Sequence, residues 1–323
     1  MSEAILQVRD LKVEYATPSG PAEAVNGVSL DLAEGEFLAI VGESGCGKST
    51  LLFAIAQLLS YPASIVGGSV IFDGVDLTAL TPEELRQHRW HDISLVMQSA
   101  MNALNPTLSI GAQLADACRA HTDWDDKRIA ERSAEVLSMV SIDVVHLKSY
   151  PFQLSGGMRQ RAMIAMALLL EPKLVIMDEP TSALDVVAQR SLMRQVEALR
   201  HELGFSVLFV THDMSVVSHF SDRLAVMYAG EIVELDTTRE VFDRPQHPYS
   251  QGLLDAFPSL LGEARQLTGI AGTPPSLVNP PPGCLFAPRC AYVMEVCREI
   301  RPELITKGTR AVRCHLVNPL ESS

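Results

Sequence analysis

The chain has 323 residues, of which 47% are hydrophobic, and its formal net charge is −13. This length suits one large domain with an appendage, or two domains. The acidic balance argues against a protein that coats DNA or RNA, because such binding depends on clustered lysine and arginine. The longest nearly unbroken apolar stretch, residues 162–170, is far shorter than the ~20 residues that span a bilayer. The amino terminus lacks a signal-like leader, so we expect the chain to stay in the cytosol.

A loop that contains three glycines, residues 42–50, follows the β-rich pattern of residues 4–41. It has the pattern G-x-x-x-x-G-K-S and is followed by an apolar stretch at 51–59. Glycines let successive backbone N–H groups converge on a phosphate, Lys48 adds a cation, and Ser49 can place its hydroxyl on Mg²⁺. A helix that starts here points its positive end at the anion. The sequence thus predicts a nucleotide site made by Gly42, Ser44, Gly45, Gly47, Lys48, Ser49 and Thr50.

The middle of the chain predicts an α/β fold. A second β-like stretch lies at 69–74, and from about 105 to 151 apolar residues recur at helical spacings, which indicates an inserted helical subdomain at about 99–153. The apolar runs at 174–177 and 206–210 are typical of central strands in a parallel sheet covered on both faces. A predicted helix at 187–203, closed by Gly204, joins them into a strand-helix-strand unit.

Four cysteines mark the end of the chain. Proline-rich stretches at 273–275 and 280–283 predict a stiff connector, and we place a domain boundary near 240, giving domains 1–240 and 241–323. Four cysteines within about thirty residues of a cytosolic chain suggest thiolate coordination. Their wide gaps leave a [4Fe–4S] cluster, tetrahedral zinc and unligated thiols open, for Cys284, Cys290, Cys297 and Cys314.

Candidate catalytic groups follow the predicted strands. Asp178 and Glu179 close the run at 174–177, so both carboxylates are expected at the carboxyl end of a strand, where open α/β sheets bind ligands. One carboxylate can hold Mg²⁺ while its neighbour acts as general base on water. His212 follows the run at 206–210. Ser155 and the glycines after it precede a helical run, which is a start suited to an anion.

These motifs occur in one order: the phosphate loop, Gln98, residues 154–158, residues 178–179, residues 182–185 and His212. In this order they resemble the ATP-binding cassette (ABC) ATPases, and the resemblance covers residues 1 to about 240. It implies a P-loop ABC-type nucleotide-binding domain with a RecA-like core, a β-rich N-terminal subdomain and an inserted helical subdomain. It also implies ATP hydrolysis, with ATP and Mg²⁺ bound.

The resemblance assigns roles residue by residue. Tyr15 is similar to the residue that stacks on adenine, Glu179 to the catalytic base, and His212 to the residue that orients the γ-phosphate. Lys48 is similar to the phosphate ligand. The implied Mg²⁺ contacts are Ser49, Gln98 and Asp178, and the further nucleotide contacts are Ser155, Gly156, Gly157 and Asp185. In this family residues 155–157 serve the nucleotide of the opposite subunit, so a second cassette is implied, as another copy or a relative.

Two stretches narrow the branch. Residues 98–106 and 247–254 resemble segments that mark the ATPases of oligopeptide, dipeptide and nickel importers, and Met158 resembles the D-type member, whose partner is an F-type cassette. This implies two membrane permeases, an extracytoplasmic substrate-binding protein, no nucleic acid, and a peripheral position on the cytoplasmic face of the inner membrane. For the tail cysteines, the resemblance to this branch favours a [4Fe–4S] cluster over zinc. Cys46, in the phosphate loop, and Cys118, in the helical subdomain, are expected to be bystanders.

Two alternatives remain beside di- or oligopeptide import. The same machine imports nickel, a metallophore or glutathione when other subunits set the specificity. A soluble ABC ATPase that acts on nucleic acid or ribosomes is the alternative of a different class, and the acidic balance and single phosphate loop oppose it.

Overall fold

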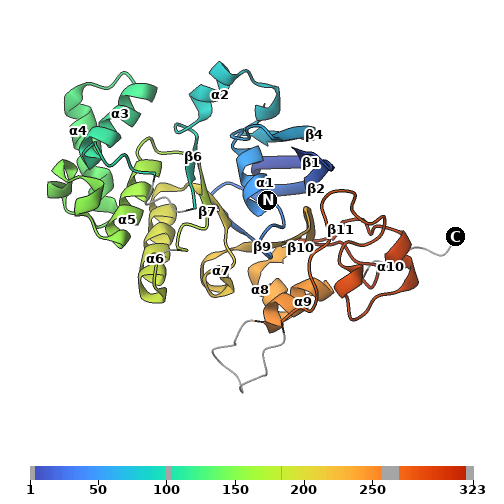
Figure 1. The fold of residues 1–323 in the computed structure, drawn as a ribbon. Helices are drawn as coiled ribbons and strands as arrows, with labels where there is room; N and C mark the ends of the chain where they lie inside the picture. Colours follow the sequence, from blue (N-terminus) through green and yellow to red (C-terminus); the bar gives the residue numbers. More distant parts are fainter. Residues whose placement is uncertain (1–3, 99–102, 183, 257–268, 318–323) are drawn as a thin grey trace. The chain divides into compact units, whose positions relative to one another are not determined.

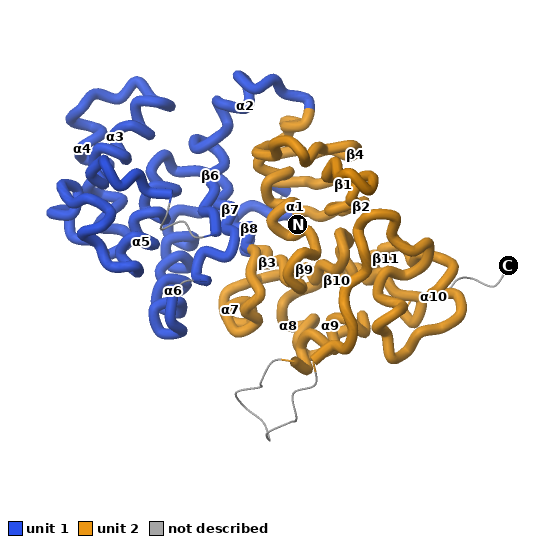
Figure 2. The backbone as a smooth tube through the Cα atoms, in the orientation of Figure 1, with its two compact units in different colours: residues 1–5, 32–37, 79–209 blue, residues 6–31, 38–78, 210–323 orange. Residues whose placement is uncertain are grey.

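The computed structural model describes residues 4–98, 103–182, 184–256 and 269–317. The chain forms two compact units, each assembled from segments far apart in the sequence (Figure 2). Unit 1 comprises residues 1–5, 32–37 and 79–209, and unit 2 comprises residues 6–31, 38–78 and 210–323. The domain boundary predicted near residue 240 stays a prediction.

An antiparallel sheet, mostly in unit 2, forms the β-rich start of the chain (Figure 1). Its strand order is β2-β1-β4-β5, and β1 pairs antiparallel with β4 so that Tyr15 lies opposite Ala63. Leu6 and Val8, and after an irregularity Leu11 and Val13, are buried at the two-residue period of a strand with one covered face. The bounds are β1 Ala4–Thr17, β2 Gly20–Ala33, β4 Ala63–Phe72 and β5 Val75–Asp76.

A second group of strands in unit 2 runs in the order β11-β12-β10-β9-β3. Strand β3 (Phe37–Val41) is parallel to β9 (Arg223–Tyr228), and the remaining pairs are antiparallel. The C-terminal tail thus adds a hairpin to the sheet that carries the phosphate loop. The other elements of unit 2 are α1 Lys48–Ile55, α7 Met214–Phe220, α8 Thr238–Asp243, α9 Pro248–Asp255, α10 Glu295–Glu299, β10 Glu231–Thr237, β11 Ile305–Lys307 and β12 Arg310–Val312.

Unit 1 contains the buried strands β6 (Ile93–Val96), β7 (Leu174–Asp178) and β8 (Ser206–Val210). Every residue of the three is buried, and β6 is parallel to β7. The predicted apolar strands are therefore confirmed. Helix α6 starts one residue before the predicted 187 and ends, as predicted, at Leu203, where Gly204 is the C-cap with a left-handed φ of 77°. The helices are α2 Pro82–His88, α3 Ile110–His121, α4 Asp126–Met139, α5 Gly156–Ala167 and α6 Val186–Leu203.

The predicted helical insertion consists chiefly of α3 and α4, which pack on each other, while α4 packs on α5 (Figure 1). The buried Arg132 of α4 donates from Nε to the carbonyl oxygen of Leu169 (2.9 Å) and from Nη2 to that of Leu168 (3.0 Å). The carbonyl of Leu168 also accepts the N–H of Glu171 (3.2 Å), so Arg132 adds a second donor there and supplies a donor to Leu169 just beyond the end of α5. In the part of the chain that the structure describes, none of the helices has the length and apolar character needed to cross a bilayer.

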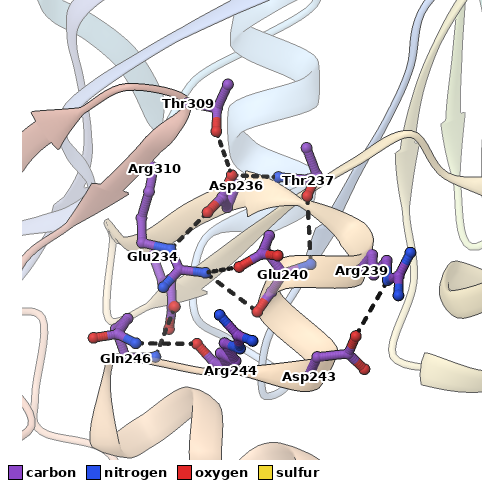
Figure 3. Close-up of polar contacts among 10 residues, drawn as sticks. All are labelled: Glu234, Asp236, Thr237, Arg239, Glu240, Asp243, Arg244, Gln246, Thr309 and Arg310. Carbon is purple, nitrogen blue, oxygen red and sulfur yellow. Dashed lines mark hydrogen bonds and ion pairs between the residues drawn. The ribbon is translucent and has the colours of Figure 1, made fainter.

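Polar contacts attach the tail hairpin to β10 and α8 (Figure 3). Asp236 of β10 is 2% exposed, and its Oδ2 lies 2.6 Å from Nε of Arg310. Thr309 donates to its Oδ1 from Oγ1 (2.8 Å), and the N–H of Thr237 donates to the same atom (2.7 Å). Arg310 also reaches the carboxylate of Glu240 at 3.1 Å. A buried carboxylate with three donors is well compensated, so this network anchors the tail.

Candidate nucleotide site

The phosphate loop turns directly from β3 into α1. Gly47 is the N-cap of α1 at φ 103°, and a Cβ placed there would lie 2.1 Å from the carbonyl oxygen of Ala24, so only glycine fits. Lys48 is 6% exposed, and its Nζ donates to the carbonyl oxygens of Gly42 (2.8 Å) and Glu43 (2.9 Å). These two bonds hold the loop in a tight curve around the ammonium group of Lys48, as in loops that bind phosphate through backbone N–H groups and a lysine.

Tyr15 lies beside the first turn of α1. Its hydroxyl oxygen is 3.2 Å from Oγ1 of Thr50, which lies in that turn and is buried. The structure therefore brings the predicted adenine-stacking residue next to the predicted phosphate-binding helix. Ser49 lies in the same turn and is half-buried.

The predicted base and one of the predicted Mg²⁺ contacts lie together in unit 1. Gln98 donates from Nε2 to Oε2 of Glu179 at 3.0 Å. Asp178, the last residue of β7, is 3% exposed, and Glu179 follows it with a left-handed φ of 45°. Such strained conformations in residues other than glycine cluster at functional sites, because the surroundings must hold them in place. The two carboxylates thus occupy the strand-end position that the sequence predicts.

The segment around Ser155 forms the start of α5. Oγ of Ser155 accepts a hydrogen bond from the N–H of Met158 at 3.2 Å, which makes Ser155 a helix N-cap. A Cβ at Gly157 would meet no atom within 4 Å, so this face of the helix start is open. The predicted anion-suited helix start is present in unit 1.

Asp185 has a structural partner that the sequence prediction did not include. Its Oδ1 accepts hydrogen bonds from the N–H groups of Val187 (3.0 Å) and Ala188 (2.9 Å), and it is the N-cap of α6. The neighbouring Ala183 lies outside the described residues. The predicted histidine, His212, comes after β8 and belongs to unit 2. It is exposed and lies two residues before the start of α7.

Comparisons with known proteins agree with these features. Residues 25–182 match the model of the ABC transporter family, and residues 233–297 match that of the oligopeptide/dipeptide transporter C-terminal region. Residues 147–218 also match an AAA domain described as a putative AbiEii toxin of a type IV toxin–antitoxin system. The dipeptide transport ATP-binding protein DppD of Caldanaerobacter subterraneus is 42% identical, over 97% of each chain. The chain belongs to the ABC transporter ATP-binding proteins of the oligopeptide/dipeptide family.

Further relatives support this membership. The oligopeptide transport ATP-binding protein OppD of Escherichia coli is 43% identical, over 95% of this chain and 92% of its own. The ATP-binding cassette MJ0796, solved as a dimer in a post-hydrolysis state with ADP and phosphate, has a TM-score of 0.65 and 30% identity, covering 72% of this chain and 99% of its own. This ABC protein is therefore an ATPase with the predicted α/β P-loop cassette fold.

The four tail cysteines of this ABC ATPase line one small cavity, together with His247, Phe286 and His315. Burial, together with smaller contributions from the nearby Cys297 and Cys314, raises the pKa of Cys284 to about 11. Burial likewise raises the pKa of Cys290. Among the described residues, no group of three or more His, Cys, Asp or Glu side chains is arranged to hold a metal ion, so the predicted cluster or zinc site stays a prediction.

The two remaining cysteines are buried, and their assignment as bystanders stays a prediction. Cys46 lies in the loop, is 5% exposed, and burial raises its pKa despite Lys48 nearby. Cys118 is buried in α3, and burial raises its pKa too. Buried thiols with raised pKa values carry little thiolate, the reactive form.

Three residues at the loop were missed by the sequence analysis: Glu43, Tyr249 and Arg289. The N–H of Glu43 donates to Oη of Tyr249 (2.9 Å), and its carboxylate pairs with Arg289 (2.7 and 2.9 Å). Tyr249 belongs to the 247–254 segment that marks the branch, which was the available signal. Nothing in the sequence indicated its contact with the phosphate loop.

Proposed function

We propose that this ABC ATPase powers an importer that moves di- or oligopeptides through partner permeases. The observation that carries the proposal is the match over nearly the whole chain to relatives named as dipeptide or oligopeptide transport ATP-binding proteins. The match to the oligopeptide/dipeptide C-terminal region, over residues 233–297, supports the same branch. If the assembled importer instead transports nickel, a metallophore or glutathione, the proposal that its substrates are peptides is wrong.

In the proposed site Lys48 and the N–H groups of the loop bind the β- and γ-phosphates of ATP. The support is the curled loop at the start of α1, with the ammonium of Lys48 held at its centre. Tyr15 stacks on the adenine from beside the same helix. The hydroxyl of Ser49 and the oxygens of Gln98 and Asp178 are ligands of the kind that Mg²⁺ takes. When bound, Mg²⁺ neutralises charge on the phosphates.

Hydrolysis in this proposal uses Glu179 as the base. Its carboxylate accepts a proton from the attacking water, and the 3.0 Å bond from Nε2 of Gln98 fixes the direction of that carboxylate. His212 orients the γ-phosphate and the water. A positioned base contributes about 10²–10⁴-fold to such a step.

A complete site requires a second cassette. Ser155, Gly156 and Gly157 would contact the γ-phosphate held by a partner subunit, either an F-type relative or a second copy. The open face at Gly157 supports this role, because that helix start has space for an incoming ligand. ATP binding closes the pair and hydrolysis lets it reopen, which drives alternating access in the permeases.

The remaining partners follow from the proposed transport role. Two membrane permeases would bind this subunit at the cytoplasmic face of the inner membrane, and an extracytoplasmic protein would deliver the peptide. Nucleic acid is not a proposed partner, since the net charge of −13 opposes binding to phosphate backbones.

The test of the ATP site is Glu179→Gln in the assembled transporter. Glutamine keeps the size and an acceptor oxygen but cannot take the proton, so ATP binding should persist while turnover falls about 10²–10⁴-fold. The closed pair should accumulate, as measured by crosslinking between the two cassettes. Unchanged turnover would remove Glu179 from the mechanism.

We also propose that Cys284, Cys290, Cys297 and Cys314 hold a [4Fe–4S] cluster with a structural role. The support is that four thiols, the ligand type of such clusters, line one cavity of the tail. Iron and acid-labile sulfide would be measured in protein purified without oxygen, beside Cys290→Ser. Equal amounts of iron and sulfide that fall in the variant support the proposal, and zinc without iron contradicts it.

A further inference from the structure

Arg289 joins the C-terminal tail to the phosphate loop through an ion pair with Glu43. It lies in the tail, and its side chain is 4% exposed. An arginine has five N–H donors in a planar fork, and here five hydrogen bonds match them. Nη1 donates to Oε2 of Glu43 (2.7 Å) and to Oη of Tyr228 (3.3 Å), Nη2 donates to Oε1 of Glu43 (2.9 Å) and to the carbonyl of Ile270 (3.1 Å), and Nε donates to the carbonyl of Ala271 (2.9 Å).

The partner, Glu43, is the second residue of the loop, and the C-terminal region holds it at two points. Its carboxylate pairs with Arg289, and its N–H donates to Oη of Tyr249, whose side chain is fully buried. The third polar group of Glu43, its carbonyl oxygen, accepts from Nζ of Lys48 at 2.9 Å. Arg289 and Tyr249 therefore fix the residue whose backbone holds the phosphate-binding lysine.

The same short turn of the tail faces both the loop and the cysteine cavity. The turn at Ala287–Arg289 presents Arg289 to Glu43, while Cys290, the next residue, lines the cavity. The ring of Phe286 also lines the cavity and packs on Tyr249, with centroids 5.4 Å apart. The segment that lines the cysteine cavity therefore also carries the residues that contact the phosphate loop and Tyr249, and all of them lie in unit 2.

From these contacts we infer that Arg289 is a positioning residue for ATP binding, through which the C-terminal region holds the phosphate loop in its binding form. Arg289 acts on Glu43, and Glu43 acts on Lys48. Loss of the pair frees the segment that carries both carbonyl acceptors of Lys48, so ATP affinity falls while the groups that cleave ATP stay intact. The inference rests on the proposed ATP site at this loop.

The experiment measures ATP affinity and turnover for Arg289→Gln in the full chain and in the assembled transporter. Couplings between sites are typically worth about 5–150-fold in affinity, and we expect ATP affinity to fall on the order of tenfold. The KM for ATP should rise by a similar factor, with kcat at saturating ATP within about twofold of the parent value. Arg289→Lys keeps the charge without the fork and should give an intermediate affinity.

The matched control is Arg310→Gln. Arg310 is another tail arginine, and it bonds to residues of β10 and α8: its Nε lies 2.6 Å from Oδ2 of the buried Asp236, and its Nη2 donates to Glu240 (Figure 3). This variant weakens the attachment of the tail hairpin, so it measures what general loosening of the tail does to ATP binding. ATP affinity in this variant should stay within about twofold of the parent value.

A double-mutant cycle with Glu43→Gln completes the test. If the pair acts as one unit, Arg289→Gln should have little further effect once Glu43 is replaced. If Arg289→Gln fails to fold, Glu43→Gln and Arg289→Lys still report on the pair. Unchanged ATP affinity in the Arg289 variants, equal losses in Arg289→Gln and Arg310→Gln, or additive effects in the cycle would overturn the inference.

Lys48→Ala separates this inference from the proposed ATP site. Loss of ATP binding in Lys48→Ala with no effect of Arg289→Gln defeats the inference alone. Retained ATP binding in Lys48→Ala defeats the assignment of the loop itself, and the role of Arg289 falls with it.

Discussion

Replacement of Gly47 by alanine should damage the loop more than replacement of Gly45, although the two glycines lie two residues apart. At Gly47 a Cβ would lie 2.1 Å from the carbonyl oxygen of Ala24 and 2.9 Å from Cε of Met227, and φ is 103°. The left-handed backbone costs an alanine roughly 1–2 kcal/mol. Overpacking of a tight site adds about 1–3 kcal/mol, so Gly47→Ala should lower the free energy of unfolding by about 2–5 kcal/mol.

Gly45 isolates the backbone contribution. Its φ is 80°, but a Cβ would meet no atom within 4 Å, so Gly45→Ala should cost only the left-handed strain of about 1–2 kcal/mol. Urea unfolding of the full chain without nucleotide measures both variants, with equal m-values as the check that only stability has changed. If Gly47→Ala is no less stable than Gly45→Ala, the close approach of the loop to residue 24 does not limit the site.

Three further substitutions test other parts of the structure. A Cβ at Gly157 would meet no atom within 4 Å, so Gly157→Ala should leave the free energy of unfolding of the isolated chain unchanged or raise it by up to ~1 kcal/mol. ATP turnover of the assembled transporter should nevertheless fall at least about tenfold. A destabilised chain with normal turnover would refute the role of Gly157 in the partner's site. A Cβ at Gly283 would lie 2.4 Å from a backbone carbonyl oxygen, so Gly283→Ala should destabilise the tail by about 1–3 kcal/mol in hydrogen exchange, while Gly269→Ala, with open space, should not. Arg132→Met leaves the carbonyl oxygen of Leu169 without its donor, while that of Leu168 keeps the N–H of Glu171 (3.2 Å), so thermal unfolding should show a loss of about 1–3 kcal/mol. No measurable loss would count against the Arg132 bonds.

Features that depend on neighbours in the sequence could be predicted. The run at 37–41 became β3 with the same bounds, because a continuous apolar run before a glycine-rich loop has few alternatives. The end of α6 at Gly204 follows from the left-handed conformation that glycine tolerates. The separate roles of Gln98 and Glu179 came from the family resemblance, and their hydrogen bond, across 81 positions of sequence, was not predicted.

Features that depend on partners far apart in the sequence were missed, because local sequence patterns do not indicate which distant residues will meet. The pair of Arg289 and Glu43 joins residues 246 positions apart, and a charged residue in a proline-rich tail predicts no particular partner. The antiparallel strands β9 and β10, which connect the loop region to the tail hairpin, were not predicted. The N-cap role of Asp185 was accessible, because an aspartate before a helical pattern is a common start signal, but its place in a nucleotide motif drew the interpretation elsewhere.

The central claim, that ATP hydrolysis by this chain drives peptide uptake, is tested most directly by transport into vesicles. The chain would be assembled with its permeases, its partner cassette and its extracytoplasmic binding protein, and uptake of labelled di- and oligopeptides would be measured with ATP supplied on the side of the cassettes. We predict ATP-dependent uptake that is lost with Glu179→Gln while ATP binding persists. Hydrolysis that proceeds without peptide uptake, or uptake of nickel or glutathione in place of peptides, would contradict the account.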